Sequence, residues 1–205
     1  QFTESIKSAR ANLVILTAQQ LLTAATLQHA AQTLSRQKIP VAFGGRIFNL
    51  RPDLAQSISG HFLGPDLHAA LEEIEVILSG QAKQTRTKAA SQIHVTAYQA
   101  FNLRRVQIDM AVKETLDPLS ISPDDIGTGL HFLGENISAA LQLGDMAYVS
   151  AEIEWLKGLL RSHGSPESQL AYFLQAYTNA VDKTINGQGS PIMEWLESEI
   201  QRLQA

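Results

Sequence analysis

The sequence of 205 residues contains no cysteine, which excludes disulfides, thiolate metal sites and a cysteine nucleophile. It also lacks any uninterrupted apolar run close to the roughly 20 residues that a membrane-spanning helix needs. The N-terminus shows no signal-peptide pattern. These absences predict a soluble, cytoplasmic protein that does not enter a membrane.

An excess of charge of one sign is missing as well. The 16 basic and 20 acidic residues give a net charge of -4, and the basic residues are spread along the chain. Direct binding of nucleic acid is therefore not expected. Hydrophobic residues make up 44% of the chain, which is enough for one ample core or two modest ones.

Motifs of the common catalytic classes are absent. The chain contains no G-x-S-x-G elbow, no H-E-x-x-H, no P-loop and no G-x-G-x-x-G, and no histidines have the spacing of a metal site. The acidic residues are scattered in the way expected of solvated helix faces. Catalysis is therefore not favoured, unless its chemistry belongs to a bound cofactor.

The first 80 residues alternate between short apolar runs and helical periodicity. Residues 11–16, 39–43 and 61–63 are predicted to be buried strands. Three helices are predicted as well. The first lies between the first two strands and ends before Pro40, the second covers about two turns at residues 52–58, and the third runs from Pro65 to Gly80. Because the crossovers are long enough for a helix, parallel strands in β-α-β-α-β-α order are expected.

Paired glycines end the second predicted strand. Gly44 and Gly45 form a tight turn, or they leave the backbone bare for a ligand. Thr17 follows the first strand, where its hydroxyl caps the next helix or contacts that ligand. Arg46 anchors a phosphate or propionate, or pairs with a surface carboxylate.

The polar segment 81–91 is the predicted domain boundary, which gives domains 1–80 and 81–205. Beyond it, five amphipathic helices on short connections predict an antiparallel helical bundle. Ser-Pro steps at 122–123, 165–166 and 190–191 are helix starts, and the step from Gly144 to Asp145 ends one helix and caps the next. The predicted fold class is thus α/β plus all-α, with a partial parallel sheet followed by the bundle.

The stretches VAFGGRIFN (41–49), PDL (52–54) and GHFLG (60–64), with the helix from Ala69 to Leu78, resemble the second half of a cobalamin-binding Rossmann-like (flavodoxin-like) domain. The similarity is to the version found in light- or cobalamin-responsive regulators of the MerR type, and it covers residues 11–80. The family's Asp-x-His-x-x-Gly motif, which can supply a histidine ligand to cobalt, is absent from this chain. The family's helical region precedes this domain, whereas the bundle here follows it.

The resemblance implies cobalamin as the cofactor and five residues as its binding site. Thr17 would reach the nucleotide tail, the tail would lie against Gly44 and Gly45, and Gly64 would end the last strand; Arg46 belongs to the same motif. We expect the tail to enter at a topological switch point, where strand ends leave a crevice.

The resemblance begins midway through the family's domain, and the chain begins at Gln1 rather than Met. We therefore expect an upstream segment, a protein partner or a second copy of the chain to complete the sheet. Three functions stay open: a sensory or regulatory module acting through partner association, a corrinoid carrier for methyl transfer or rearrangement, and a ligand-free interaction scaffold. The sequence does not identify the signal, the partner or the role of the bundle.

Overall fold

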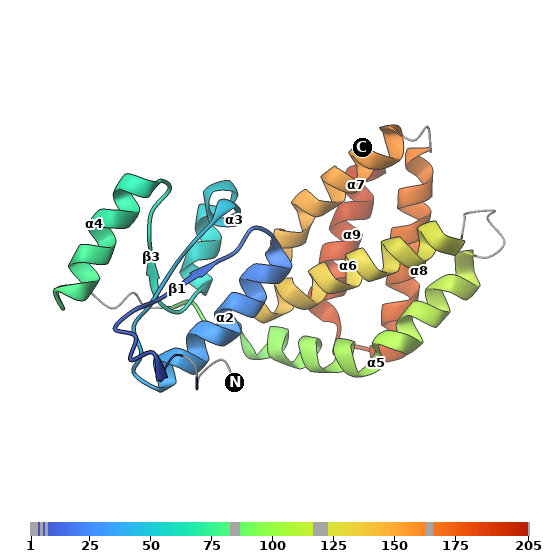
Figure 1. Cartoon of the computed structure of the whole chain (residues 1–205). Helices are drawn as coiled ribbons and strands as arrows, with labels where there is room; N and C mark the ends of the chain where they lie inside the picture. Colours follow the sequence, from blue (N-terminus) through green and yellow to red (C-terminus); the bar gives the residue numbers. More distant parts are fainter. Residues whose placement is uncertain are drawn as a thin grey trace. The chain divides into compact units, whose positions relative to one another are not determined.

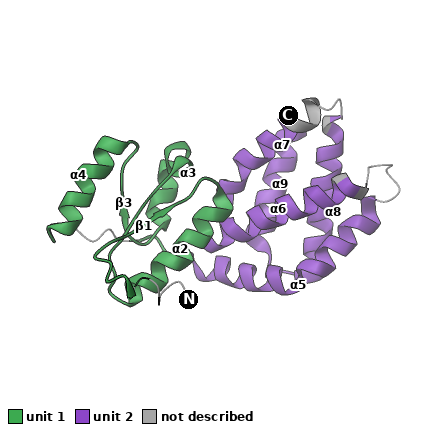
Figure 2. Ribbon diagram, in the orientation of Figure 1, with its two compact units in different colours: residues 1–89 green, residues 90–205 purple. Residues whose placement is uncertain are grey.

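A computed structural model of the chain describes residues 4, 6, 8–82, 87–116, 123–162 and 166–204 (Figure 1). The chain divides into two compact units, residues 1–89 (unit 1) and residues 90–205 (unit 2) (Figure 2). The last residues of unit 1 are tied back to it, because the Lys88 N–H donates to the Gln56 carbonyl at 2.8 Å and the Thr87 hydroxyl donates to the Ile58 carbonyl at 3.4 Å. The polar segment predicted as a boundary thus partly packs on unit 1.

Unit 1 contains a three-stranded parallel sheet in the order β1-β2-β3 (Figure 1). The strands are β1 (Val14–Thr17), β2 (Val41–Gly44) and β3 (His61–Phe62). Val14 is in register with Val41, and Phe43 with Phe62. The predicted parallel pairing is confirmed, although each strand is shorter than its apolar run.

Helices connect and follow the strands. They are α2 (Leu21–Arg36), α3 (Arg46–Leu50), the 3₁₀ helix η1 (Pro52–Ser57) and α4 (Leu67–Leu78). The helix α3 was not predicted, because only Gly44 and Gly45 were interpreted, as a tight turn or a ligand edge, and no helix was assigned to the residues after them. Those residues form one helical turn that buries Ile47 and Phe48. Residues 52–57 are helical as expected, in the tighter 3₁₀ form.

One face of the sheet is a closed apolar core. Phe43, Phe48 and Phe62 form an aromatic cluster with ring centroids 5.0 to 6.1 Å apart. The helix α2 brings small and branched residues to the core, namely Leu21, Ala24, Ala25, Leu27, Ala31 and Leu34, all of which are buried. Burial of these side chains supplies most of the driving force for folding of unit 1.

The other face of the sheet is only partly covered. Ala42 and Leu63 pack with Ile77 of α4 in a small cluster. On β1, however, Ile15 is 49% exposed. The far side of α4 also exposes large apolar side chains, Leu67, Leu71 and Leu78.

In unit 2 the described residues form helices and no strand. These are α5 (Gln92–Leu116), α6 (Pro123–Leu143), the 3₁₀ helix η3 (Met146–Val149), α7 (Ser150–Ser162), α8 (Glu167–Ile185) and α9 (Ser190–Gln204). Helix α5 packs along α6 and α8, and α8 packs along α9. None of the described helices is long and apolar enough to cross a bilayer.

The helix ends in unit 2 follow the predicted signals where they can be compared. Helix α9 begins at Ser190, and Gly144 has a φ of +85° at the end of α6. The Asp145 carboxylate then accepts a hydrogen bond from the Ala147 N–H at 2.9 Å and caps η3. The predicted capping residues Ser122 and Ser165 lie outside the described residues.

Candidate functional site

The predicted site residues lie at one edge of the sheet of unit 1, where its three strands end. Thr17 and Gly44 are register partners on β1 and β2. The Ala18 N–H donates to the Gly44 carbonyl at 3.0 Å, and the Leu63 N–H to the Phe43 carbonyl at 2.9 Å. The chain thus brings the ends of all three strands together, as the parallel order requires.

At this edge, the fold does not explain why residue 44 is a glycine. It lies within β2, is buried and has no positive φ. A Cβ atom placed on it would meet only the Leu63 Cβ, at 3.8 Å, which is an ordinary van der Waals contact. Glycine in a strand costs about 0.5–1 kcal/mol relative to alanine. The tight-turn interpretation therefore does not apply to Gly44.

Gly45 and Gly64, in contrast, are needed by the fold itself. Gly45 has a φ of +121°, and a Cβ there would collide with the backbone carbonyl of Ala18. Gly64 has a φ of +81°, and its Cβ would lie 2.6 Å from the Cβ of Ala69 at the start of α4. Both positions favour glycine whether or not a ligand binds.

Thr17 and Arg46 both have exposed side chains at this edge. Thr17 does not cap α2, because the N-cap residue of that helix is Gln20. The Thr23 hydroxyl accepts hydrogen bonds from the Gln19 and Gln20 N–H groups there, at 3.1 and 3.0 Å. Arg46 is the first residue of α3, and its N–H donates to Gln19 Oε1 at 3.4 Å. The capping interpretation of Thr17 is wrong, and its hydroxyl faces solvent beside Gly44.

The expected topological switch point is not present in the described sheet. The strands follow one another in chain order, so both crossovers run in the same direction. A switch point arises only where neighbouring crossovers run in opposite directions. It would require a further strand beside β1.

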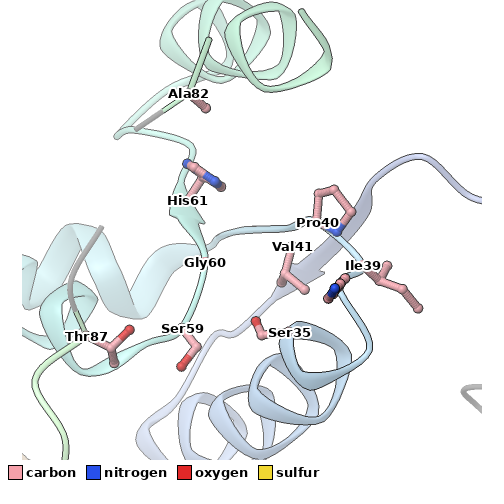
Figure 3. Close-up of a pocket in the computed structure, with 10 residues that line it drawn as sticks. Ser35, Ile39, Pro40, Val41, Ser59, Gly60, His61, Ala82 and Thr87 are labelled. Atoms are coloured by element: carbon pink, nitrogen blue, oxygen red, sulfur yellow. The ribbon is translucent and has the colours of Figure 1, made fainter. Parts of the chain in front are cut away.

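Sequence interpretation missed a hollow at the opposite edge of the same sheet, where β2 and β3 begin. It has a volume of about 600 Å³. Figure 3 shows its lining, which includes Ser35 from the end of α2, Val41, and the segment Ser59, Gly60 and His61. These residues come from three separate parts of the sequence and share no motif, so the sequence offered no signal for it.

Unit 2 contains a polar cluster among α5, α6 and α8 that the sequence did not reveal either. The Arg105 guanidinium lies 3.1 Å from Asp109 and 3.9 Å from Glu135, donates to the Leu130 carbonyl at 2.8 Å and stacks on Phe101. Burial raises the pKa of the nearby Tyr177 hydroxyl well above its usual range, although the positive charge of Arg105 opposes the shift.

A second polar network joins η3 and α7 to α9. The Glu199 carboxylate is buried and accepts hydrogen bonds from Ser150 and Arg202, each at 2.6 Å. The Trp195 indole N–H donates to the Ser150 hydroxyl at 3.1 Å, and Arg202 also pairs with Glu154. Both oxygens of the buried Glu199 carboxylate are thus hydrogen-bonded, as is typical of a structural network.

The described residues contain no group of three or more His, Asp or Glu side chains that could hold a metal ion. No family model and no curated protein matches the chain. Any assignment of function thus depends on the strand ends of unit 1 and on the resemblance described above.

Proposed function

We propose that unit 1 is the second half of a cobalamin-binding type of Rossmann-like domain, and that the protein is a sensory or regulatory module acting through association with a partner. One observation supports this most directly: Gly44 is bare although the fold leaves room for a side chain there. Glycine at such a position is useful where a ligand lies against the backbone. The neighbouring Thr17 hydroxyl offers a hydrogen bond at the same strand ends.

These residues suit the nucleotide tail of a corrinoid but not its metal. Thr17 and Gly44 would contact the tail, Gly45 would keep the turn out of its way, and the exposed Arg46 would pair with a phosphate or propionate. The chain has no Asp-x-His-x-x-Gly motif to ligate cobalt from below. A bound corrinoid would supply its own cobalt chemistry, and this chain would only position it.

The outer edge of β1 offers a place for the partner. The N–H groups of Val14 and Ala18 donate toward β2, to Pro40 and Gly44. Because alternate residues of a parallel strand face the same neighbour, the N–H groups of Ile15 and Thr17 face the outer edge. Such an edge pairs readily with an added strand. Where the crossover of that strand runs in the opposite direction to those of unit 1, the missing switch point would lie between it and β1, beside Thr17.

Replacing Gly44 tests the ligand site. In the full chain, Gly44→Ala should fold and still bind hydroxocobalamin, whereas Gly44→Leu should reduce binding about 100-fold or more by filling the space next to the strand end. Binding is measured by the change in the corrin absorption spectrum. Gly127→Leu on α6 is the matched control, because nothing lies within 4 Å of a Cβ at that position.

Equal binding by the wild type and Gly44→Leu would refute the tail site. If neither the wild type alone nor the wild type mixed with a sheet-completing partner binds hydroxocobalamin, the ligand-free scaffold becomes the better account. The corrinoid carrier needs a lower ligand from elsewhere, so it predicts cobalt ligation by a histidine of the partner, visible in the absorption spectrum.

The open edge is tested separately with Ile15→Pro. Proline removes an N–H group that faces away from β2, so the sheet of unit 1 should persist while pairing with an added strand is blocked. Light scattering with size-exclusion chromatography should show self-association or partner binding by the wild type and its loss in the variant. Ile15→Thr, which keeps the N–H group, is the control. A wild type that stays monomeric and binds no partner would contradict the completed-sheet proposal.

A further inference from the structure

The hollow at the amino ends of β2 and β3 has the chemistry of a small anion site. Its wall contains the exposed Lys38 and the hydroxyls of Ser35, Ser59 and Thr87. The apolar residues Pro40, Val41 and Ala82 are also part of its lining. A volume of about 600 Å³ lies in the range of small-molecule sites. The site is separate from the strand ends used in the proposed function.

Ser59 is fixed by two hydrogen bonds with Gln28. Its N–H donates to Gln28 Oε1 at 2.6 Å, and its hydroxyl oxygen accepts a hydrogen bond from Gln28 Nε2 at 3.3 Å. Gln28 itself is buried. Because the Ser59 hydroxyl accepts this hydrogen bond from the Gln28 amide, its O–H can still donate to another group. Ser59 lines the hollow together with Ser35 and Val41, all three of which Figure 3 labels.

Lys38 occupies a backbone conformation that is unfavourable for lysine. It follows the last turn of α2 with a φ of +59°, and its N–H donates to the Ser35 carbonyl at 2.9 Å. Glycine is the usual residue at this helix-ending position because it has no Cβ. Lysine therefore costs stability here, and residues held in such conformations cluster at functional sites.

The charges around the hollow indicate how a ligand would lie. On the far side, His61 Nδ1 is 3.6 Å from Glu73 Oε1, so a carboxylate stands near that wall. An anionic group would avoid Glu73 and approach Lys38, Ser35 and Ser59 instead. The rest of the ligand would then lie against Pro40 and Val41.

We propose that this hollow binds a small organic oxyanion, a phosphate monoester or a carboxylate attached to a compact apolar or ring-shaped body. Lys38 supplies the positive charge, and Ser35 and Ser59 donate hydrogen bonds. The unfavourable φ at Lys38 is the cost of placing a cation at the end of α2.

The test is an NMR titration of the full chain with phenyl phosphate and, separately, with benzoate, which distinguishes the two sources of oxyanion. Benzyl alcohol at the same concentration tests the need for charge. Saturable shifts of the Ser59 and Gly60 amides are expected with at least one anion and not with the alcohol. Lys38→Gly should weaken that binding about tenfold or more, because it removes a charge-assisted hydrogen bond. The same variant should melt roughly 3 °C higher, since glycine suits the positive φ.

Arg36→Gln is the matched control, because it removes a neighbouring positive charge that does not line the hollow. It should change the affinity less than about twofold. The proposal is overturned if Lys38→Gly binds the anions as well as the wild type does. It is also overturned if benzyl alcohol shifts the same amides as strongly, or if neither anion gives a saturable shift.

Discussion

The glycines of unit 1 and unit 2 differ in what an added side chain would meet. In unit 1 the backbone sets the limit, because Gly45, Gly60 and Gly64 have positive φ and a Cβ at each would overlap a neighbouring residue. In unit 2 the backbone has the same effect at Gly144, where a Cβ would lie 2.7 Å from the Ala90 Cα. At Gly134, however, a long side chain fills the space, because the Arg105 guanidinium lies where a Cβ would be. A glycine therefore has to be interpreted from what its missing side chain would meet.

The two units also differ in which groups they leave exposed or unpaired. Unit 1 satisfies its interior but leaves a strand edge and apolar side chains such as Ile15 and Leu67 exposed. Unit 2 also exposes large apolar side chains, among them Leu103, Val106 and Met110 of α5. In addition, its Tyr177 hydroxyl is buried without a hydrogen-bond partner among the described residues. Both units therefore leave apolar side chains exposed. The difference is that unit 1 also ends in an unpaired strand edge, whereas unit 2 buries an unpartnered hydroxyl.

The largest expected effect is that of Gly45→Ala. Its φ of +121° and ψ of 167° are accessible almost only to glycine, and the new methyl group would overlap the Ala18 carbonyl. We expect unit 1 to lose about 3 kcal/mol or more. Hydrogen exchange of the β2 amides measures the loss, and it should become roughly 100-fold faster.

Gly44→Ala is the matched control for this prediction, since its Cβ meets only an ordinary contact. It should change the stability of unit 1 by less than about 1 kcal/mol. Equal losses for the two variants would show that the backbone of β2, and not the Ala18 contact, sets the limit.

A smaller effect is expected for Gly134→Ala in unit 2. The methyl group would displace the Arg105 guanidinium from the Leu130 carbonyl, at a cost of about 1–2 kcal/mol despite the better helix propensity of alanine. Urea unfolding followed by tryptophan fluorescence reports on this unit, because both tryptophans lie in it. Gly127→Ala, at an open position of the same helix, should instead gain roughly 0.5–1 kcal/mol. A gain for both variants would mean that Arg105 moves aside without cost.

The smallest effect, and of opposite sign, is expected for Tyr177→Phe. Removing a buried hydroxyl without a partner should stabilise unit 2 by about 1 kcal/mol. Because burial raises the pKa of Tyr177 in the folded state, its contribution to stability is complete below the unfolded pKa near 10 and is lost as the pH rises further. The advantage of the variant should therefore grow above about pH 10.

The control for this variant is Tyr172→Phe, an exposed tyrosine on the same helix. It should leave both stability and its pH dependence unchanged. Urea unfolding at pH 7 and at about pH 10.5 compares the two variants. Parallel pH profiles for the wild type and Tyr177→Phe would indicate that the hydroxyl is satisfied in solution.

The order of elements in unit 1 could be predicted because each strand is a distinct apolar run and each crossover shows helical periodicity. Parallel pairing followed from the length of those crossovers. The helix α3 was missed because the paired glycines before it suggested a turn, and its five residues are too few to show a period. Strand ends were also misplaced, since pairing across the sheet decides which residues of an apolar run become strand.

For the candidate site, the sequence indicated the correct edge but not the reason for each glycine. That Gly44 and Gly45 differ depends on Ala18 and Leu63, which are distant in the sequence. The hollow beside Lys38 and the cluster around Tyr177 depend on contacts of the same kind. A single sequence reveals local periodicity, but it reveals little about contacts between residues that are far apart in the chain.

The strand order of unit 1 also has a consequence for how the protein is assembled. Each strand pairs with the next one in the chain, at separations of 27 residues between Val14 and Val41 and 19 between Ala42 and His61. Such local pairing favours fast folding, and during synthesis every later strand joins the side away from β1. The pairing of β1, β2 and β3 therefore leaves the outer edge of β1 unused. A strand from a partner or a second copy that docks there would join a sheet whose own three strands are already paired, so this association would follow the folding of unit 1.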